Sequence, residues 1–398
     1  MKLAIFNVKF SENIGDGLLA TCLENQIRDF LPSVELQTFD LAGRVNYGET
    51  NKYRHLLLRV LAHLPNNIRQ RVVRYLVASK VRTLKAKWYD EISNADAVII
   101  GGGNLFQDDD LNFPTKIAAV IDAVLYYKKP LAIYAVGVTA NWSTQAQALF
   151  DAIKNVDLVH CSVRDKLAQT AWKNHFPDSQ DALILPDPAL SVSWPTTQKK
   201  KISSSKTRTY RPIIGLCITD PLILVRHSSD PLSTNVFQSV SNYISLIAGL
   251  VKRGYRIYLF CNGAREDYKL LEKIANTGVI SDLINSSNVN VTNRPKNPFD
   301  LLEIIAIADV VIAHRLHACI AAHALDIPTF GLGWDNKVEA FFDFSERRKY
   351  FIESKASSKE IISKVDRLLK EGCDHEVRPH LKNKSIAGIK KLIDDLKS

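Results

Sequence analysis

A cluster of residues able to do chemistry follows an apolar run at 310–313, where the sequence reads His314, Arg315, Leu316 and His317. An arginine carries a permanent charge and a planar set of N–H donors that suit carboxylate and phosphate groups. A histidine titrates near neutrality and can hold or release a proton there. Both types stand after a predicted buried strand and at the start of a predicted helix, where free N–H groups favour anions. The pattern therefore predicts an anion site with a titratable group.

Other polar or glycine-rich stretches also follow predicted strands. The glycines at 101–103 permit a ligand to approach the backbone closely, and the helix expected after Asn13 offers free N–H groups to an anion. Lys337 is available for a second acidic group of a ligand. The candidate binding or catalytic residues in these stretches after predicted strands are Asn13, Asp16, Gly101, Gly102, Gly103, Asn104, Asp108, Arg164, Asp335 and Lys337.

Apolar runs of four to seven residues alternate with helical patterns along the chain, which is typical of βαβ units around a parallel sheet. Residues 196–212 are polar and without periodicity, which indicates a linker. We expect an α/β protein of two tandem Rossmann-like domains, over 1–195 and 213–398, whose strand ends bind ligands at a central cleft. Strands are expected at 3–8, 34–39, 97–100, 131–136, 158–162, 182–185, 213–218, 256–260, 289–291, 310–313 and 329–332.

The net charge of +10 is concentrated in 52–88, which holds ten Lys or Arg residues and no Asp or Glu. A basic amphipathic helix in this segment can lie on an anionic membrane surface. Alternatively, it can pack its apolar face on its own domain and leave its charges in water. Nucleic acid is not expected as a partner, because no known binding module accompanies the charge. The apolar residues that recur at helical spacing here, and predict a basic amphipathic helix, are Ile68, Val72, Val73, Leu76, Val77, Val81, Leu84 and Trp88.

The length of 398 residues and the hydrophobic content of 46% fit an enzyme-sized globular protein. No apolar run reaches the roughly 18 residues of a transmembrane helix. The run at 3–6 is too short for a signal-peptide core, so we expect a cytoplasmic protein. The scattered cysteines favour buried thiols and no metal site; they are Cys22, Cys161, Cys217, Cys261, Cys319 and Cys373.

In their order and spacing, these residues resemble the polysaccharide pyruvyltransferase family. The resemblance implies a two-domain fold similar to the GT-B glycosyltransferases, with no metal or tightly held cofactor. It also implies transfer of the enolpyruvyl unit of phosphoenolpyruvate to a sugar of a polysaccharide or a lipid-linked oligosaccharide, which forms a cyclic pyruvate ketal. The matching motifs are Asn13-x-Gly-Asp16, Gly101–Gly103, Ser162-Val163-Arg164-Asp165, Asp187-Pro188-Ala189, Arg315-Leu316-His317 and Asp335-Asn336-Lys337.

The implied reaction gives these residues roles. Phosphoenolpyruvate carries a phosphate and a carboxylate, so Arg315 with Arg164 or Lys337 is expected to anchor it. Ketal formation needs an acid and a base. His317 is the candidate general acid, because it titrates near neutrality. Asp16 or Asp108 is expected to orient or deprotonate the acceptor hydroxyl, although the spacing of the acidic stretch around Asp108 departs from the family pattern.

Two other functions share the tandem-sheet plan. A GT-B glycosyltransferase using a sugar nucleotide needs a carboxylate for the ribose, and Asp335 is the candidate. A non-catalytic sugar-binding protein is disfavoured, because the cation and histidine cluster has no role there. A pyruvyltransferase acting on a lipid-linked acceptor is expected to lie at the inner face of the membrane, held by the basic segment 52–88.

Overall fold

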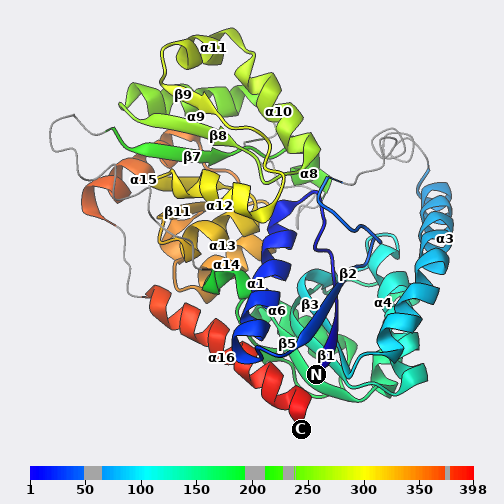
Figure 1. Cartoon of the computed structure of the whole chain (residues 1–398). Helices are drawn as coiled ribbons and strands as arrows, with labels where there is room; N and C mark the ends of the chain where they lie inside the picture. Colours follow the sequence, from blue (N-terminus) through cyan, green and yellow to red (C-terminus); the bar gives the residue numbers. More distant parts are fainter. Residues whose placement is uncertain (49–64, 193–210, 227–236, 238, 373–376) are drawn as a thin grey trace. The chain divides into compact units, whose positions relative to one another are not determined.

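The computed structural model describes residues 1–48, 65–192, 211–226, 237, 239–372 and 377–398. These residues form two compact units, which are coloured along the chain in Figure 1. The first unit comprises Met1–Ser11, Leu19–Pro188 and Lys384–Ser398, and the second comprises Glu12–Leu18 and Ala189–Asn383. Residues 384–398, which the sequence placed in the second domain, group with the first unit. Residues 12–18, which the sequence placed in the first domain, group with the second unit. Most of the expected linker, 196–212, lies outside the described residues.

The first unit is built on a parallel sheet with the strand order β2-β1-β3-β4-β5-β6. Parallel neighbours need a crossover connection, which helices provide. The strands are β1 Lys2–Asn7, β2 Glu35–Asp40, β3 Ala97–Phe106, β4 Leu131–Val138, β5 Leu158–Val163 and β6 Leu183–Ile184. The helices are α1 Ile14–Phe30, whose first residues to Leu18 group with the second unit, α3 Asn66–Ser93, α4 Asn112–Tyr127, α5 Thr144–Phe150 with the 3₁₀ turn η1 Asp151–Asn155, and α6 Lys166–His175.

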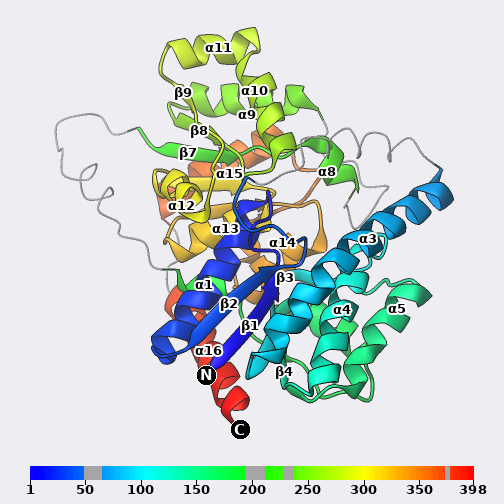
Figure 2. The ribbon, with the colours of Figure 1, turned by 45° about the vertical axis from the view of Figure 1, so that its right-hand side comes forward.

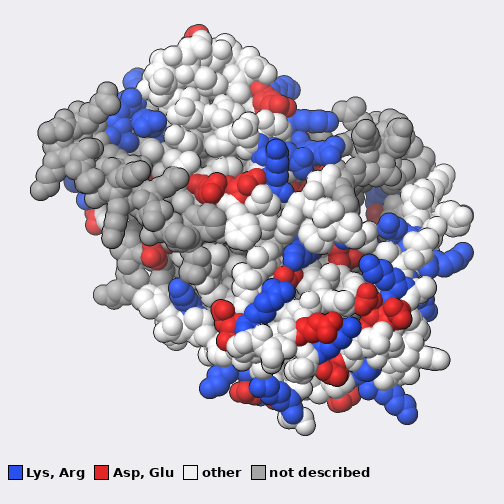
Figure 3. Space-filling view, in the orientation of Figure 1, with Lys and Arg blue, Asp and Glu red and all other residues white. Residues whose placement is uncertain are grey.

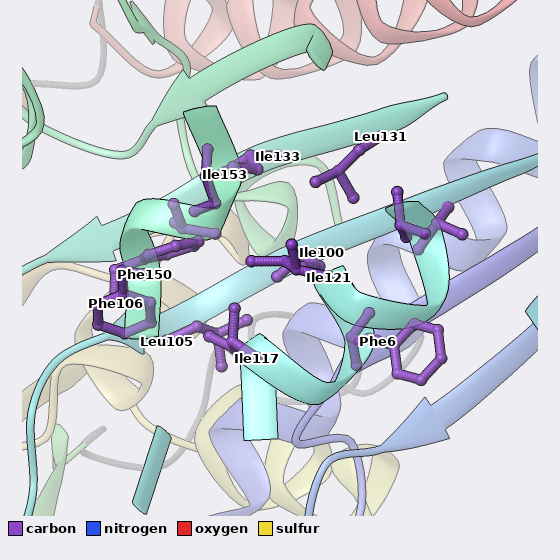
Figure 4. Packing of buried hydrophobic residues seen from close by; sticks show 14 of the residues in the cluster. Phe6, Ile100, Leu105, Phe106, Ile117, Ile121, Leu131, Ile133, Phe150 and Ile153 are labelled. Atoms are coloured by element: carbon purple, nitrogen blue, oxygen red, sulfur yellow. The ribbon is translucent and has the colours of Figure 1, made fainter. Parts of the chain in front are cut away.

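The main core of the first unit lies between its sheet and helix α4 (Figure 4). Phe6, Ile100 and Leu131 come from the neighbouring strands β1, β3 and β4 and are fully buried. Ile117 and Ile121 are four residues apart on α4, so they lie on one face of that helix, and both are also fully buried. Burying each such side chain stabilises the fold by about 1.5–3 kcal/mol. This core fixes the strand ends that carry the polar residues.

Helix α3 contains the described part of the basic segment, and its apolar residues do not form one stripe as the sequence predicted. Val81 and Trp88 are buried in the core of the first unit. Ile68 and Leu76, expected on the same stripe, are instead 49% and 40% exposed. Residues 52–64 lie outside the described part of the chain. Among the described helices, none combines the length and apolar character needed to cross a bilayer.

The second unit contains another parallel sheet, with the order β12-β11-β10-β7-β8-β9. Strands β8 to β11 have the bounds that the sequence predicted, whereas β12, α8 and α11 were not predicted. The strands are β7 Ile213–Cys217, β8 Arg256–Phe260, β9 Val289–Val291, β10 Val310–Ala313, β11 Thr329–Leu332 and β12 Phe351–Ile352. The helices are α8 Pro221–Arg226, α9 Val240–Lys252, α10 Arg265–Ala275, α11 Gly278–Asn285, α12 Pro298–Ala306, α13 Leu316–Ala324, α14 Asn336–Phe344, α15 Ser358–Glu371 and α16 Val377–Lys397, whose last part packs in the first unit.

In each sheet the first strand lies in the interior, with β1 between β2 and β3, and β7 between β8 and β10. In each sheet, successive strands are therefore added on one side of the first strand, and the chain then crosses back to add the remaining strands on its other side. Open α/β sheets bind ligands beyond the carboxyl ends of the strands at such a switch point. The two doubly wound sheets confirm the predicted fold class.

The C-terminal helix α16 is joined to the first unit by a buried polar chain. His160 on β5 bonds Oδ2 of Asp395 at 2.8 Å through Nδ1, and Oγ of Ser162 at 2.9 Å through Nε2. The Ser162 hydroxyl has no exposed surface and also accepts the backbone N–H of Ala135. A serine without solvent access cannot serve as a nucleophile for an external substrate, so this Ser-His-Asp order holds α16 in place.

Candidate active site

Arg315 stands at the carboxyl end of β10, as the N-cap residue of α13. Its Nε and Nη2 donate to the same oxygen, Oδ2, of Asp267 at 2.9 and 2.6 Å. Asp267 is fully buried in the first turn of α10, and its Oδ1 accepts the backbone N–H of Asp220 at 2.8 Å. The sequence predicted Arg315 as an anion contact but missed this buried partner.

The charges of this pair are coupled. Burial raises the pKa of Asp267, although the positive charge of Arg315 acts in the opposite direction. Burial also acts to lower the pKa of Arg315, but the Asp267 carboxylate outweighs it and the net pKa is raised. The guanidinium is thus charged and held along its Nε–Nη2 edge.

That hold leaves Nη1 as the part of Arg315 able to meet a ligand. No described residue bonds to Nη1, and the side chain is 12% exposed. The first N–H groups of α13 lie directly after Arg315 in the chain, where a helix favours negative charge. The arrangement can bind one anionic group through Nη1 and the start of the helix.

His317 lies in the first turn of α13 and faces Asp16. Its Nδ1 is 3.5 Å from Oδ1 of Asp16, whose other oxygen accepts the side-chain amide of Asn13 at 3.3 Å. Gly15 permits this approach, because a Cβ there would overlap the His317 side chain. The segment Glu12–Leu18 packs within the second unit. The structure thus brings Asn13, Asp16 and His317 together, and a carboxylate near Nδ1 can orient the ring. His317 is 8% exposed, and its Nε2 is buried.

Asn262, two residues after the end of β8, holds this segment in place. Its side-chain amide donates to Oδ1 of Asn13, and its backbone oxygen accepts the N–H of Ile14 at 3.0 Å. Sequence reasoning missed Asn262. The signal that could have found it is similar to the one that selected Asn13 and Asn104, a polar residue within a few positions after a predicted apolar strand.

The neighbouring histidine, His314, has a different environment. It is fully buried, with its ring against Phe237 and its Nδ1 3.5 Å from the hydroxyl of Tyr243. Burial, helped by the charge of Arg315, lowers the pKa of His314 to about 3. This imidazole stays neutral near pH 7, so it packs the strand end, while His317 is the candidate for proton transfer.

Asp335 and Lys337 follow β11. Oδ1 of Asp335 accepts the N–H groups of Lys337 and Val338 at 3.0 and 3.2 Å, which makes it the N-cap of α14. Its Oδ2 lies 3.3 Å from the Lys337 ammonium. Trp334 donates from Nε1 to the backbone oxygen of His314 at 2.6 Å, so the loops after β10 and β11 are connected. Asp335 thus has a structural task, and the Lys337 charge is already partly balanced.

In the first unit the glycine run lies inside β3, since the strand continues to Phe106 and does not end at Ile100 as predicted. Gly102 and Gly103 adopt φ of 78° and 88°, a region open mainly to glycine, and the register with β4 shifts after Gly103. This distortion directs Asn104 toward Arg164, whose Nη2 donates to the Asn104 Oδ1 at 3.3 Å. The predicted residues Asn104 and Arg164 therefore share one polar cluster.

Arg164 and Asn104 each have a second partner in this cluster. Nε of Arg164 donates to Asp165 at 3.1 Å, and the amide of Asn104 donates to Gln107 at 2.6 Å. Asp108 is directed elsewhere, because its two oxygens accept the backbone N–H groups of Leu111 and Ser143, each at 2.9 Å. A carboxylate tied to two backbone donors favours loop structure over base catalysis.

The described cysteines are buried free thiols, and Cys373 lies outside the described residues. Burial raises the pKa of Cys217 well above its usual value, which makes that thiol unreactive at neutral pH. In the described part of the chain, no group of three or more His, Cys, Asp or Glu side chains could hold a metal ion.

A sequence model of the family described as polysaccharide pyruvyl transferase matches residues 13–336. The chain belongs to this family. The matched range starts at Asn13 and ends at Asn336, so it contains both the Asp16 and the His317 sides of the site. A search of curated protein sequences found no match.

Solved structures match the fold at low sequence identity. The UDP-GlcNAc 2-epimerase of Methanocaldococcus jannaschii has a TM-score of 0.53 at 10% identity, with 99% of each chain covered. The N-terminal domain of trehalose-6-phosphate phosphatase from Candida albicans has a TM-score of 0.56 at 10% identity, covering 100% of this chain and 98% of that one. A putative UDP-N-acetylglucosamine 2-epimerase from Listeria monocytogenes has a TM-score of 0.53 at 12% identity, covering 98% and 94%. These similarities support the GT-B-like fold.

Proposed function

We propose that the protein transfers the pyruvyl unit of phosphoenolpyruvate to two hydroxyls of a sugar and releases phosphate. In this reaction the methylene carbon of the donor gains a proton and becomes a methyl group. Two sugar oxygens bond to the central carbon, and the C–O bond to phosphate breaks. Of the two hydroxyl protons, one balances the new methyl group and the other leaves with phosphate. The product is a cyclic pyruvate ketal.

The observation that carries this proposal is the Arg315-Leu316-His317 site in a member of the pyruvyl transferase family. Arg315, fixed by Asp267, offers Nη1 to the donor phosphate or carboxylate. Lys337, at the start of α14 in the same unit, is the candidate to bind the second anionic group of the donor. The chemistry uses protein side chains alone in this proposal, with phosphoenolpyruvate as substrate and no cofactor.

His317 is proposed as the general acid that protonates the methylene carbon. A ring that holds a proton near neutrality suits this step. Asp16, whose Oδ1 is 3.5 Å from Nδ1, orients the ring. For the role expected from the sequence, orienting or deprotonating the acceptor hydroxyl, Asp16 is proposed over Asp108, since both oxygens of Asp108 bind backbone N–H groups.

The acceptor is proposed to contact the polar cluster of the first unit. Asn104, Gln107 and Arg164 provide amide and guanidinium groups next to the distorted glycine run of β3. Sugar hydroxyls both donate and accept hydrogen bonds, so amides suit them. We further propose that the acceptor belongs to a polysaccharide precursor carried on a lipid, so that the protein works peripherally at the cytoplasmic face of the membrane.

One assay tests the reaction. The purified protein is incubated with phosphoenolpyruvate and a panel of sugar acceptors, and phosphate release is followed together with the mass gain of the acceptor. Acceptor-dependent phosphate release is expected, and it should be lost in Arg315→Ala. Transfer from a sugar nucleotide instead, with nucleotide release and no use of phosphoenolpyruvate, would favour the alternative of a glycosyltransferase.

A further inference from the structure

The side of α3 that faces away from the core of the first unit exposes apolar side chains. Ile68, Tyr75 and Leu76 are 49%, 75% and 40% exposed. Positions 68, 75, 79 and 86 are separated by seven, four and seven residues, so they lie on one face of the helix. Ser79 and Ala86, both small, are also exposed and complete the strip. Figure 2 shows that the N-terminal half of α3 extends beyond α4, so the exposed strip continues past the packed part of the helix.

Cations lie on both sides of this strip. At about 100° per residue, Arg71 and Arg82 fall on one side and Lys80 and Lys87 on the other. All four are exposed, and Figure 3 shows Lys and Arg side chains on the surface over α3, at the right of the view. None of the ion pairs among the described residues involves any of these four side chains. We call the nine positions 68, 71, 75, 76, 79, 80, 82, 86 and 87 the outer face of α3.

Negative charge is nearly absent near this face. The sequence has no Asp or Glu between positions 50 and 89. Two acids form described ion pairs with α3, Asp110 with Arg69 at 3.6 Å and Asp122 with Lys85 at 3.2 Å. Arg69 lies at the same angle around the helix as Lys87, so Asp110 is the one acid beside an edge of the outer face in these pairs, and it pairs with none of the four cations named above. The outer face therefore keeps its positive charge.

We infer that the outer face of α3 binds an anionic lipid bilayer. Exposed apolar side chains between flanking cations are what an interfacial helix needs, because the apolar side chains enter the headgroup region while the long basic side chains reach the phosphates. Tyrosine is enriched at this depth of the membrane. A second copy of the chain would bring like charges together, and nucleic acid would leave Ile68 and Leu76 without a partner. This surface is separate from the site of the proposed reaction.

Liposome flotation with the full chain tests the inference. The protein is mixed with vesicles of phosphatidylcholine alone or with 30% phosphatidylserine, at low and at high salt. We expect binding only to the anionic vesicles, reduced by salt because charge attraction at a surface is screened. Each cation near an anionic surface contributes about fivefold to partitioning. The double variant Lys80→Gln/Arg82→Gln should then bind about 30-fold more weakly.

Two matched variants separate this face from general effects of charge and apolarity. Lys359→Gln/Arg367→Gln removes the same charges from exposed positions on α15 and should bind like the wild type. Tyr75→Ser/Leu76→Ser should weaken binding, whereas Leu222→Ser, at a residue 79% exposed on α8, should not. Both pairs of variants leave the buried face of α3 unchanged.

Several results would overturn the inference. They are equal binding to neutral and anionic vesicles, an equal loss in the α3 and α15 double variants, or binding to a DNA duplex without binding to vesicles. Dimerisation in sedimentation velocity that Tyr75→Ser/Leu76→Ser abolishes would assign the outer face to a second copy instead. No donor or acceptor enters this assay, so its outcome is independent of the proposed pyruvyl transfer.

Discussion

Arg315→Lys is the substitution that best tests how the donor is held. It keeps a positive charge beside Asp267, so the buried carboxylate retains a partner. The lysine has one nitrogen where arginine has three, however, and that nitrogen is expected to remain with Asp267 Oδ2, which the arginine contacts at 2.6 and 2.9 Å. The donor then loses the contact that Nη1 provides, although the net charge of the site is unchanged.

The expected loss follows from that single contact. A hydrogen bond to a charged group contributes about 1.5–3 kcal/mol, which corresponds to about 10- to 150-fold in affinity. Isothermal calorimetry with phosphoenolpyruvate measures it directly, and kinetics should show it mainly as a higher KM, because the contact is made with both substrate and transition state. Arg315→Ala is a poorer test, since it also leaves Asp267 buried without its partner.

Arg253→Lys serves as the matched control. Arg253 in the same unit also pairs through Nε with an aspartate, Asp366, at 3.3 Å, but it is 60% exposed and precedes the amino end of β8 instead of following the carboxyl end of a strand. This variant should bind the donor as the wild type does. If Arg315→Lys bound phosphoenolpyruvate within twofold of the wild type while remaining folded by circular dichroism, the assignment of Nη1 to the donor would be refuted.

Three further predictions concern proton transfer and stability. His317→Ala should keep the fold and donor binding but lower the transfer rate by about 10²–10⁴-fold; near-normal turnover would make His317 structural. Asp267→Asn should lower the free energy of unfolding in urea by about 3–5 kcal/mol, because Arg315 is left without its countercharge; an unchanged urea midpoint would contradict this. Burial lowers the pKa of His160, although the hydrogen bond and charge of Asp395 act to raise it. For Asp395, burial acts to raise the pKa, but the bonds from Lys391 and His160 outweigh burial, so the pKa of Asp395 is lowered. Both groups therefore stabilise the fold at high pH and lose this effect as pH falls, His160 below 6.5 and Asp395 below 3.8. The Tm of the wild type should drop from pH 8 to pH 5, and the drop should be less steep in His160→Asn. Equal slopes of Tm against pH in the two proteins would count against this account.

Strand patterns predicted most of the fold, because buried parallel strands appear as short continuous apolar runs. The four strands from β8 to β11 match their predicted bounds for that reason. Strand β3 was predicted too short, since three glycines after Ile100 look like a turn in the sequence. Strand β12 has only two residues and pairs only with β11 at the sheet edge, which is too little for any periodicity to indicate.

Helix α3 shows a different limit of sequence patterns. Its apolar residues occur on two faces, so helical spacing alone does not say which one meets the core. In the structure, the face of Val81 and Trp88 packs on the core, where the bulky indole lies beside Phe6 with the two ring centroids 5.7 Å apart. Ile68 and Leu76 then remain in solvent. The prediction of a packed helix is confirmed for the face of Val81 and Trp88, and membrane association stays a prediction for the opposite face.

The candidate site was predictable where a residue follows a strand, and not where its partner comes from elsewhere in the chain. Arg315 could be selected because it follows the apolar strand β10. Asp267 lies 48 residues earlier on α10 and looks in the sequence like one of two acids that favour the start of that helix. Only the fold shows that this carboxylate is fully buried. A buried charge without a partner would cost several kcal/mol, so Asp267 and Arg315 require each other. The pair thus fixes which edge of the arginine a substrate can reach.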